Sequence, residues 1–220
     1  MISPFWRGLT FAAVTALLAG CGSSSTLRLY VLGSPARPTI GVWSEADLPV
    51  IELKTVSVPD YLDSSDILRR VGPNEVAASP TGRWGERLSV GLTQALASEL
   101  SSRLPKVVIA MTPPSGPTRR LFVDIERFDI EADGQCLVTA RWRITAGDGQ
   151  TTSESEHGAF REAAASTDDP AIASAMTRAV DQLADRIAAT IEREQPPAIL
   201  SSGAGDDADP AIMRSPRVQR

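Results

Sequence analysis

Two stretches of the chain carry apolar residues at steps of three and four, the pattern of a helix with one core-facing side. The first stretch, residues 84–104, has the apolar positions Trp84, Leu88, Leu92, Ala95, Leu96, Leu100 and Leu104. The second, residues 168–193, has the apolar positions Ile172, Met176, Val180, Leu183, Ile187 and Ile191. Its beginning combines aspartate with proline at residues 168–170, which is typical of a helix N-terminus. We therefore expect two amphipathic helices.

The remaining apolar segments are short and several alternate with polar residues, as β-strands do. They are residues 27–32, 50–58, 66–71, 75–78, 106–111, 120–130, 136–146 and 151–160. Turn residues separate many of them, including Gly72-Pro73-Asn74 and Asp133-Gly134. We expect an α+β fold with a largely antiparallel sheet of about eight strands and both helices packed on one face. The first two strands are expected to pair side by side.

The first 20 residues have the pattern of a lipoprotein signal peptide. Arg7 supplies a positive charge, and residues 9–18 form an apolar run that is too short to cross a bilayer. Small residues then lead to Cys21, the position that is lipidated after cleavage in bacterial lipoproteins. An ordinary secretory signal followed by a chance cysteine is the alternative. We predict lipidation at Cys21 and attachment to a membrane through this lipid.

The pattern divides the chain into four parts. Residues 1–20 are the signal peptide, residues 21–26 a lipidated polar tether, residues 27–194 one domain and residues 195–220 a tail expected to be disordered. Removal of the signal peptide takes away Arg7 and no acidic residue, so the net charge changes from −5 to −6. An acidic protein lacks the basic surface that nucleic acids require, so we expect no nucleic-acid partner.

The sequence contains few residues suited to catalysis or metal binding. His157 is the single histidine and lies in a polar segment, so we interpret it as a surface residue rather than a catalyst. Cys136 lies in a strand-like run and is expected in the core. These two residues alone do not complete a closed zinc site, which usually takes four ligands. We predict no enzyme activity, no metal and no cofactor, and we interpret Arg141 and Arg143 as cross-strand charge partners of Asp124 and Glu126.

Apolar residues in turns are candidates for contact with a partner protein. Tyr61 and Leu62 follow a proline-aspartate turn, and Pro73 and Asn74 form the turn of a predicted hairpin. An exposed apolar group rimmed by polar residues can mark an interface. The alternative is that Tyr61 and Leu62 insert under the sheet as core residues. We take Tyr61, Leu62, Pro73 and Asn74 as the candidate partner-binding residues.

These features occur in an order that resembles a known protein family. The relevant segments are the turn at residues 59–62, the hairpin around residues 72–74, Arg83-Trp84 before the first helix, Arg127-Phe128-Asp129 and Ala140-Arg141-Trp142. Together they resemble the ABC-type transport auxiliary lipoproteins over residues 21–194. The tail lies outside the resemblance.

The resemblance implies a non-catalytic subunit of a transport system in the envelope of Gram-negative bacteria. Members of this family accompany ABC transporters whose substrate-binding subunits carry MCE domains and are linked to lipid transport and membrane integrity. The resemblance thus implies an MCE-domain partner, a possible homo-oligomer and a place on the periplasmic side of the outer membrane. Gly22 agrees with this place, since aspartate after the lipidated cysteine is the usual inner-membrane signal. A lipid-binding carrier and a lipoprotein enzyme remain the alternatives.

Overall fold

The computed structural model describes residues 26–33, 48–113, 116, 119–147 and 154–194. The predicted signal peptide, Cys21 and the tail lie outside these residues. The described elements, in chain order, are β1 (Arg28–Tyr30), β2 (Val50–Leu53), the short 3-10 helix η2 (Asp60–Leu62), β3 (Asp66–Gly72), β4 (Glu75–Trp84), α2 (Leu88–Arg103), β5 (Val108–Ala110), β6 (Arg119–Ile130), β7 (Gln135–Ala146), β8 (Glu156–Ala163) and α3 (Asp169–Arg193).

The eight strands form two mixed sheets, so the α+β class is confirmed while the single sheet is replaced by two. The larger sheet has the order β5-β2-β6-β7-β8 and the smaller one β1-β4-β3. Strands β6, β7 and β8 form an antiparallel meander, whereas β2 runs parallel to both β5 and β6. In the smaller sheet β1 runs parallel to β4, and β3 is antiparallel to β4.

The expected pairing of the first two strands is wrong. β1 pairs with β4, and β2 pairs with β5 and β6. The burial of their side chains gives the reason. Ile51 and Leu53 of β2 are buried, which suits a strand inside the larger sheet. Leu29 of β1 is 66% exposed, which suits the edge of the smaller sheet.

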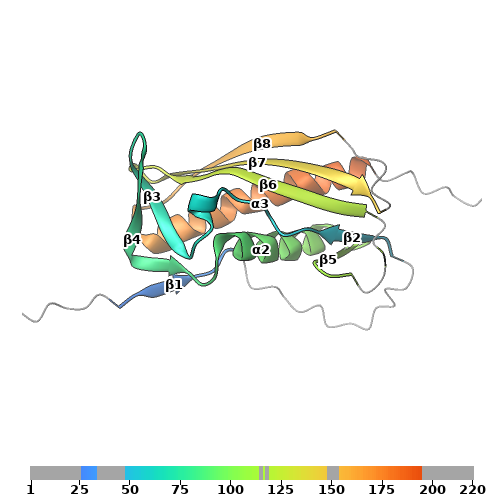
Figure 1. Cartoon of the computed structure of the whole chain (residues 1–220), viewed down its shortest axis with the longest axis horizontal. Coiled ribbons are helices and arrows are strands. Elements are labelled where there is room, and N and C mark those ends of the chain that lie inside the picture. Colours follow the sequence, from blue (N-terminus) through green and yellow to red (C-terminus); the bar gives the residue numbers. More distant parts are fainter. Residues whose placement is uncertain (1–25, 34–47, 114–115, 117–118, 148–153, 195–220) are drawn as a thin grey trace, which may run out of the picture.

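Both helices lie on the same face of the larger sheet, as predicted (Figure 1). α3 packs against β7 and β8, and α2 lies beside α3 and reaches β5. Every predicted apolar position of both helices is buried. Trp84 packs edge-on against Phe128 of β6, with ring centroids 6.1 Å apart. The prediction that the apolar stripe of each helix faces the core is therefore confirmed.

Several element boundaries differ from the prediction: β2 ends at Leu53 instead of residue 58, and β4 continues beyond residue 78. Trp84 is the last residue of β4 rather than the start of a helix, because its N–H donates to the carbonyl of Ser65 and that of Gly85 donates to Tyr30. α2 begins at Leu88, where the Ser89 N–H donates to a carboxylate oxygen of Asp63. The third strand of the meander runs from Glu156 to Ala163, later than the predicted residues 151–160, of which 151–153 are not described.

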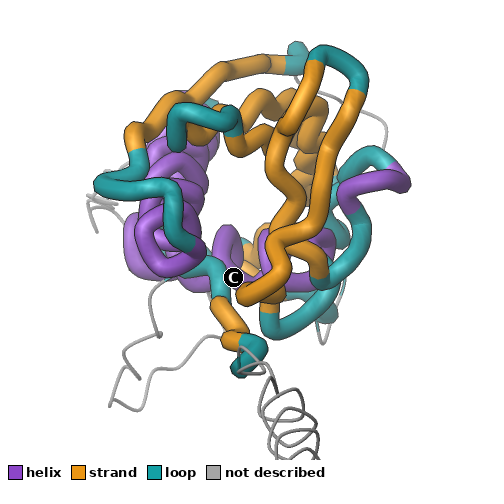
Figure 2. The backbone as a smooth tube through the Cα atoms, turned by 90° about the vertical axis from the view of Figure 1, so that its left-hand side faces the viewer, coloured by secondary structure: helices purple, strands orange, loops and turns teal. Residues whose placement is uncertain are grey.

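The smaller sheet stands at one end of the molecule, where α3 begins (Figure 1, left). Figure 2 turns this end toward the viewer and shows the β3–β4 hairpin and β1 facing the first turns of the helices. Along the described part of the chain, no helix is long and apolar enough to cross a membrane.

Candidate functional site

A surface groove of about 860 Å3 lies between the smaller sheet and the N-terminus of α3. Three segments form its walls: β1, the β3–β4 hairpin and the turn that leads into α3. Its lining residues are Thr26, Arg28, Tyr30, Arg69, Val71, Ala77, Ala78, Ser79, Pro80, Thr81, Thr167, Asp168, Asp169 and Pro170. Most of these residues are exposed, but Ser79 and Asp169 are buried. The groove thus combines an accessible, mainly apolar wall with a buried polar floor.

The floor lies where the pairing of β4 with β3 is irregular. Val76 to Ala78 pair with β3, Gly82 to Trp84 pair with β1, and Arg83 pairs with Asp66 of β3 as well. Between Asp66 and Leu68 of β3 the register shifts, so several residues of β4 oppose a single step of β3. Such a bulge re-aims side chains out of the regular alternation of a strand. Ser79 and Thr81 lie within this irregular part of β4, and the hydroxyl groups of both reach the start of α3.

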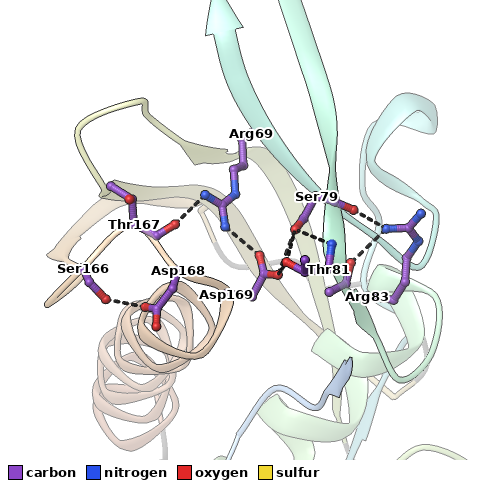
Figure 3. Close-up of polar contacts among 9 residues, drawn as sticks. Arg69, Ser79, Thr81, Arg83, Ser166, Thr167, Asp168 and Asp169 are labelled. Carbon is purple, nitrogen blue, oxygen red and sulfur yellow. Dashed lines mark hydrogen bonds and ion pairs between the residues drawn. The ribbon is translucent and has the colours of Figure 1, made fainter. Parts of the chain in front are cut away.

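Asp169, the first residue of α3, receives these side chains (Figure 3). Ser79 Oγ and Thr81 Oγ1 donate to its Oδ2 at 2.8 Å and 2.7 Å. Arg69 Nη2 donates to its Oδ1 at 2.6 Å. The Asp169 carboxylate is 2% exposed and the Arg69 side chain 27% exposed. A buried carboxylate therefore has three donors, one of them charged, as its burial requires.

The electrostatics of Asp169 follow from this balance. Burial by itself raises the pKa of the carboxyl group, but hydrogen bonds from Thr81, Arg69 and Ser79 outweigh it and hold the pKa below its usual value of 3.8. Arg69 also donates to the carbonyl oxygen of Thr167. The position at the helix N-terminus favours the negative charge as well. The cluster joins both strands of the β3–β4 hairpin to α3, and it occupies both oxygens of the Asp169 carboxylate.

A second ion-pair cluster lies beside the turn of the β3–β4 hairpin. Arg70 Nη2 and Arg127 Nη2 contact the two oxygens of Asp129 at 3.1 Å and 2.5 Å. Asp129 is buried, whereas Arg70 and Arg127 are partly exposed. Arg70 also donates to the carbonyl of Pro73 at 3.2 Å, so it connects the larger sheet to the hairpin turn. The hydrogen bond and charge of Asp129, together with the charge of Glu131, raise the pKa of Arg70 despite partial desolvation.

The two residues that the sequence offered for catalysis or metal binding, His157 and Cys136, do not line the groove. His157 is exposed on β8 and lies opposite Arg141 in the ladder, away from the groove. Cys136 is fully buried, and burial raises the pKa of its thiol to about 11, so it is a core residue as predicted. Among the residues that the structure describes, no group of three or more His, Cys, Asp or Glu is placed to bind a metal ion.

The predicted charge pairs of the outer sheet face are present. Arg141 contacts Glu126 at 2.8 Å and Arg143 contacts Asp124 at 3.6 Å. All four side chains are at least 40% exposed, so each pair contributes at most about 1 kcal/mol to stability. Arg143 also lies over the ring of Phe122, 4.5 Å from its centroid.

The structure separates the predicted partner-binding residues into two groups. Tyr61 is 51% exposed on η2, and Pro73 and Asn74 are exposed at the tip of the hairpin. Leu62 is 3% exposed and belongs to the core, so it is the inserted residue of the alternative interpretation. Cys21 lies outside the described residues.

The groove and the cluster around Asp169 were not predicted, because the sequence shows only a helix start at residues 168–170 and gives no sign of the β4 bulge.

Comparison with known proteins now gives the class of this protein. The family model described as "ABC-type transport auxiliary lipoprotein component" matches residues 30–188. The chain belongs to this family, which includes lipoproteins that assist ABC-type transport.

Particular relatives share this chain's sequence or fold. The intermembrane transport lipoprotein PqiC of Escherichia coli (strain K12) is 26% identical over 131 residues, covering 58% of this chain and 68% of PqiC. PqiC of Shigella flexneri gives the same values. Crystal structures of an uncharacterised protein and of a protein from Xanthomonas campestris superpose with TM-scores of 0.64 and 0.59 at 20% and 17% identity. Each superposition covers 76% of this chain, with 99% of the first protein and 94% of the second, and shows a shared fold.

Proposed function

We propose that this chain is a non-catalytic, lipid-anchored periplasmic subunit of an MCE/ABC-type transport system. Cys21 would hold it to the outer membrane, and an exposed surface would dock on the MCE-domain subunit. Lipid trafficking and envelope integrity are the processes it would serve. The observation that carries the proposal is the family match over residues 30–188, together with the relation to an intermembrane transport lipoprotein.

The polar clusters agree with a structural rather than a catalytic role. Asp169 and Asp129, two buried carboxylates, both accept hydrogen bonds at each oxygen: Asp169 from Arg69, Ser79 and Thr81, and Asp129 from Arg70 and Arg127. A general base needs a free lone pair aimed at a substrate. These carboxylates instead join one element of the fold to another.

The docking surface is proposed at Tyr61 and at the hairpin tip formed by Pro73 and Asn74. Figure 1 places this tip on the side of the molecule opposite β1, the strand that follows the membrane tether. A partner that approaches from the periplasm would therefore meet the tip first. Tyr61 offers a half-exposed ring, and tyrosine is enriched at interfaces because its ring is apolar and its hydroxyl is polar.

The test is co-purification of MCE-domain proteins with the detergent-solubilised chain. Wild type should retain the partner, and the variant Tyr61→Ala with Asn74→Ala should lose most of it. Met111→Ala is the matched control, since Met111 is 51% exposed directly after β5, which is the edge strand of the larger sheet. If folded wild type never retains an MCE-domain protein, the transport proposal fails. If Tyr61→Ala with Asn74→Ala binds like wild type, only the docking surface is wrong.

A lipid-binding carrier is the second candidate, and the groove of about 860 Å3 is the observation that favours it. Its volume is within the range of small-molecule sites. Most of its lining is exposed, however, whereas a carrier encloses most of its ligand. Mass spectrometry of the purified Cys21→Ser chain under native conditions tests this: a stoichiometric phospholipid would favour the carrier. The same spectrum would reveal a homo-oligomer, which we include in the proposal as an arrangement that multiplies a weak contact.

A further inference from the structure

Three large apolar side chains around β1 project into solvent. Leu27 is 51% exposed, and Leu29 and Val31 are each 66% exposed. They alternate along the chain with Arg28 and with Tyr30, which packs against the core, so they share the outward side of the strand. We call Leu27, Leu29 and Val31 the β1 face.

This face lies on an edge strand and is exposed in the isolated chain. β1 is the terminal strand of the sheet order β1-β4-β3. Natural proteins usually protect edge strands with charge, proline or a covering element, because exposed apolar edges promote association. Two further large apolar residues of the smaller sheet are exposed, Val71 and Val76, and they flank the hairpin turn. The β1 face is therefore a separate surface, and its exposure calls for a covering partner.

The position of this face in the chain identifies the partner. Six peptide units join Cys21 to Leu27, and a fully extended chain spans at most about 3.6 Å per residue, so their Cα atoms are within about 20 Å. The headgroup layer on one side of a bilayer is roughly 5–8 Å thick. A lipid on Cys21 therefore keeps β1 within reach of the membrane surface whatever conformation residues 22–26 adopt.

We propose that the β1 face rests in the headgroup layer of the membrane that holds the Cys21 lipid. This inference rests on the lipidation included in the proposed function. It makes β1 a second, non-covalent attachment that fixes the orientation of the domain. With the β1 face on the membrane, the hairpin tip on the opposite side points into the periplasm (Figure 1).

The attachment is apolar rather than electrostatic. The arginines of the adjoining segment already have acidic partners: Arg83 contacts Asp66 at 2.8 Å, and Arg87 contacts Asp63. The chain as a whole is acidic, with a net charge of −5. A surface of this kind gains little from anionic lipids. Insertion of the β1 face should therefore depend weakly on salt and on the anionic lipid content.

The test places a fluorescent reporter on the β1 face of the full, lipidated chain. An environment-sensitive label is attached at Leu29→Cys, and the protein is reconstituted in vesicles of zwitterionic lipid with and without brominated acyl chains. Val71→Cys is the matched control, because Val71 is 55% exposed on the same sheet but beside the hairpin turn. Cys136 should not react with the label, since it is fully buried and the pKa of its thiol is about 11.

The expected result is a blue-shifted emission at position 29 that brominated lipid quenches by about twofold, with neither effect at position 71. Replacement of one third of the lipid by an anionic lipid should leave the quenching unchanged. Equal quenching at both positions, or none at either on vesicle-bound protein, overturns the inference. Protection of position 29 from aqueous iodide without quenching by lipid also overturns it, because another protein surface then covers β1. Protein that does not float with vesicles at all refutes the lipidation itself.

Discussion

The carboxylate of Asp169 lies 2.6 Å from the guanidinium group of Arg69, so the first residue of α3 is paired with the middle of β3, 100 residues earlier in the sequence. Its neighbour Asp168, at the N-cap, is exposed and makes no side-chain capping bond to the helix backbone. Two adjacent aspartates at one helix N-terminus thus have opposite environments. This difference makes them a matched pair for mutation.

Asp169→Ala should destabilise the domain by about 2–3 kcal/mol, because it leaves Arg69, Ser79 and Thr81 without their acceptor in a buried site. Asp168→Ala should cost less than about 0.5 kcal/mol, because the Asp168 side chain is exposed and accepts from the exposed hydroxyl group of Ser166 rather than from the helix backbone. Urea unfolding of the unlipidated Cys21→Ser chain measures both values. Equal effects of the two substitutions would contradict the assigned burial.

The free energy of unfolding should decrease at acid pH, in part because Asp169 becomes protonated. Its pKa in the folded state lies below the usual 3.8, so its contribution is complete above the unfolded pKa and is lost as the pH falls through the folded value. Asp169→Asn removes this proton-linked contribution. The loss of unfolding free energy between pH 6 and about pH 3 should be smaller in Asp169→Asn than in wild type. An identical loss in both proteins would show that Asp169 does not titrate as inferred.

Asp181 should affect the pH dependence of stability in the opposite direction to Asp169. Burial is the main cause that raises the pKa of its carboxyl group, the charge of Glu99 adds to it, and its Oδ1 has no hydrogen-bond partner. Its ionised form is therefore disfavoured in the folded state. Asp181→Asn should stabilise the domain by roughly 0.5–1 kcal/mol at pH 7 and have less effect at acid pH, where Asp181 is protonated. Thermal unfolding at the two pH values checks both the sign and the trend.

Gly82 should not tolerate a side chain. A Cβ atom at this position would lie 2.5 Å from Asp169 Oδ2 and 3.0 Å from Asp169 Cβ. Gly82→Ala should therefore destabilise the domain by about 1–3 kcal/mol through overpacking. Gly116→Ala is the control, since no atom lies within 4 Å of the added Cβ. Because the conflict is with Asp169 itself, the cost of Gly82→Ala should shrink in an Asp169→Ala background.

Tyr61 and Leu62 should separate binding from folding. Leu62 is 3% exposed, so Leu62→Ala should cost about 2–4 kcal/mol of stability. Tyr61→Ala should change stability by less than about 0.5 kcal/mol and weaken partner binding instead. Unfolding curves and partner retention, measured on the same two variants, distinguish the roles. A large loss of stability in Tyr61→Ala would place Tyr61 in the core.

Local pattern was sufficient for the helices because each has its own apolar stripe. Leu92 and Leu183 are fully buried, as the periodicity of their segments predicts. The antiparallel meander could also be predicted from the sequence, because the Asp133-Gly134 turn connects neighbouring strands. The parallel partners of β1 and β2 were not, since parallel pairing joins segments far apart in sequence and has no local signal.

The candidate site could not be predicted from the sequence for a related reason. Ser79 and Thr81 lie beyond the predicted strand of residues 75–78, and the structure places both in strand β4 with their hydroxyl groups donating to Asp169. In a regular strand, residues two apart share a face, but that face would depend on a register that distant segments set. Asp169 in turn reads as a solvated residue of a helix start. The burial of its carboxylate depends on Arg69, which arrives from the hairpin.

The short pairing of β1 with β4 also sets how a pull on the proposed lipid anchor would travel through the domain. Three residue pairs hold β1 to β4, and because the strands are parallel, tension on the N-terminal end of β1 loads their hydrogen bonds in shear. Leu32 follows as the first buried residue of the described chain. In the proposed arrangement, tension between the membrane and the transporter would therefore load the short β1–β4 pairing before it reaches the buried core.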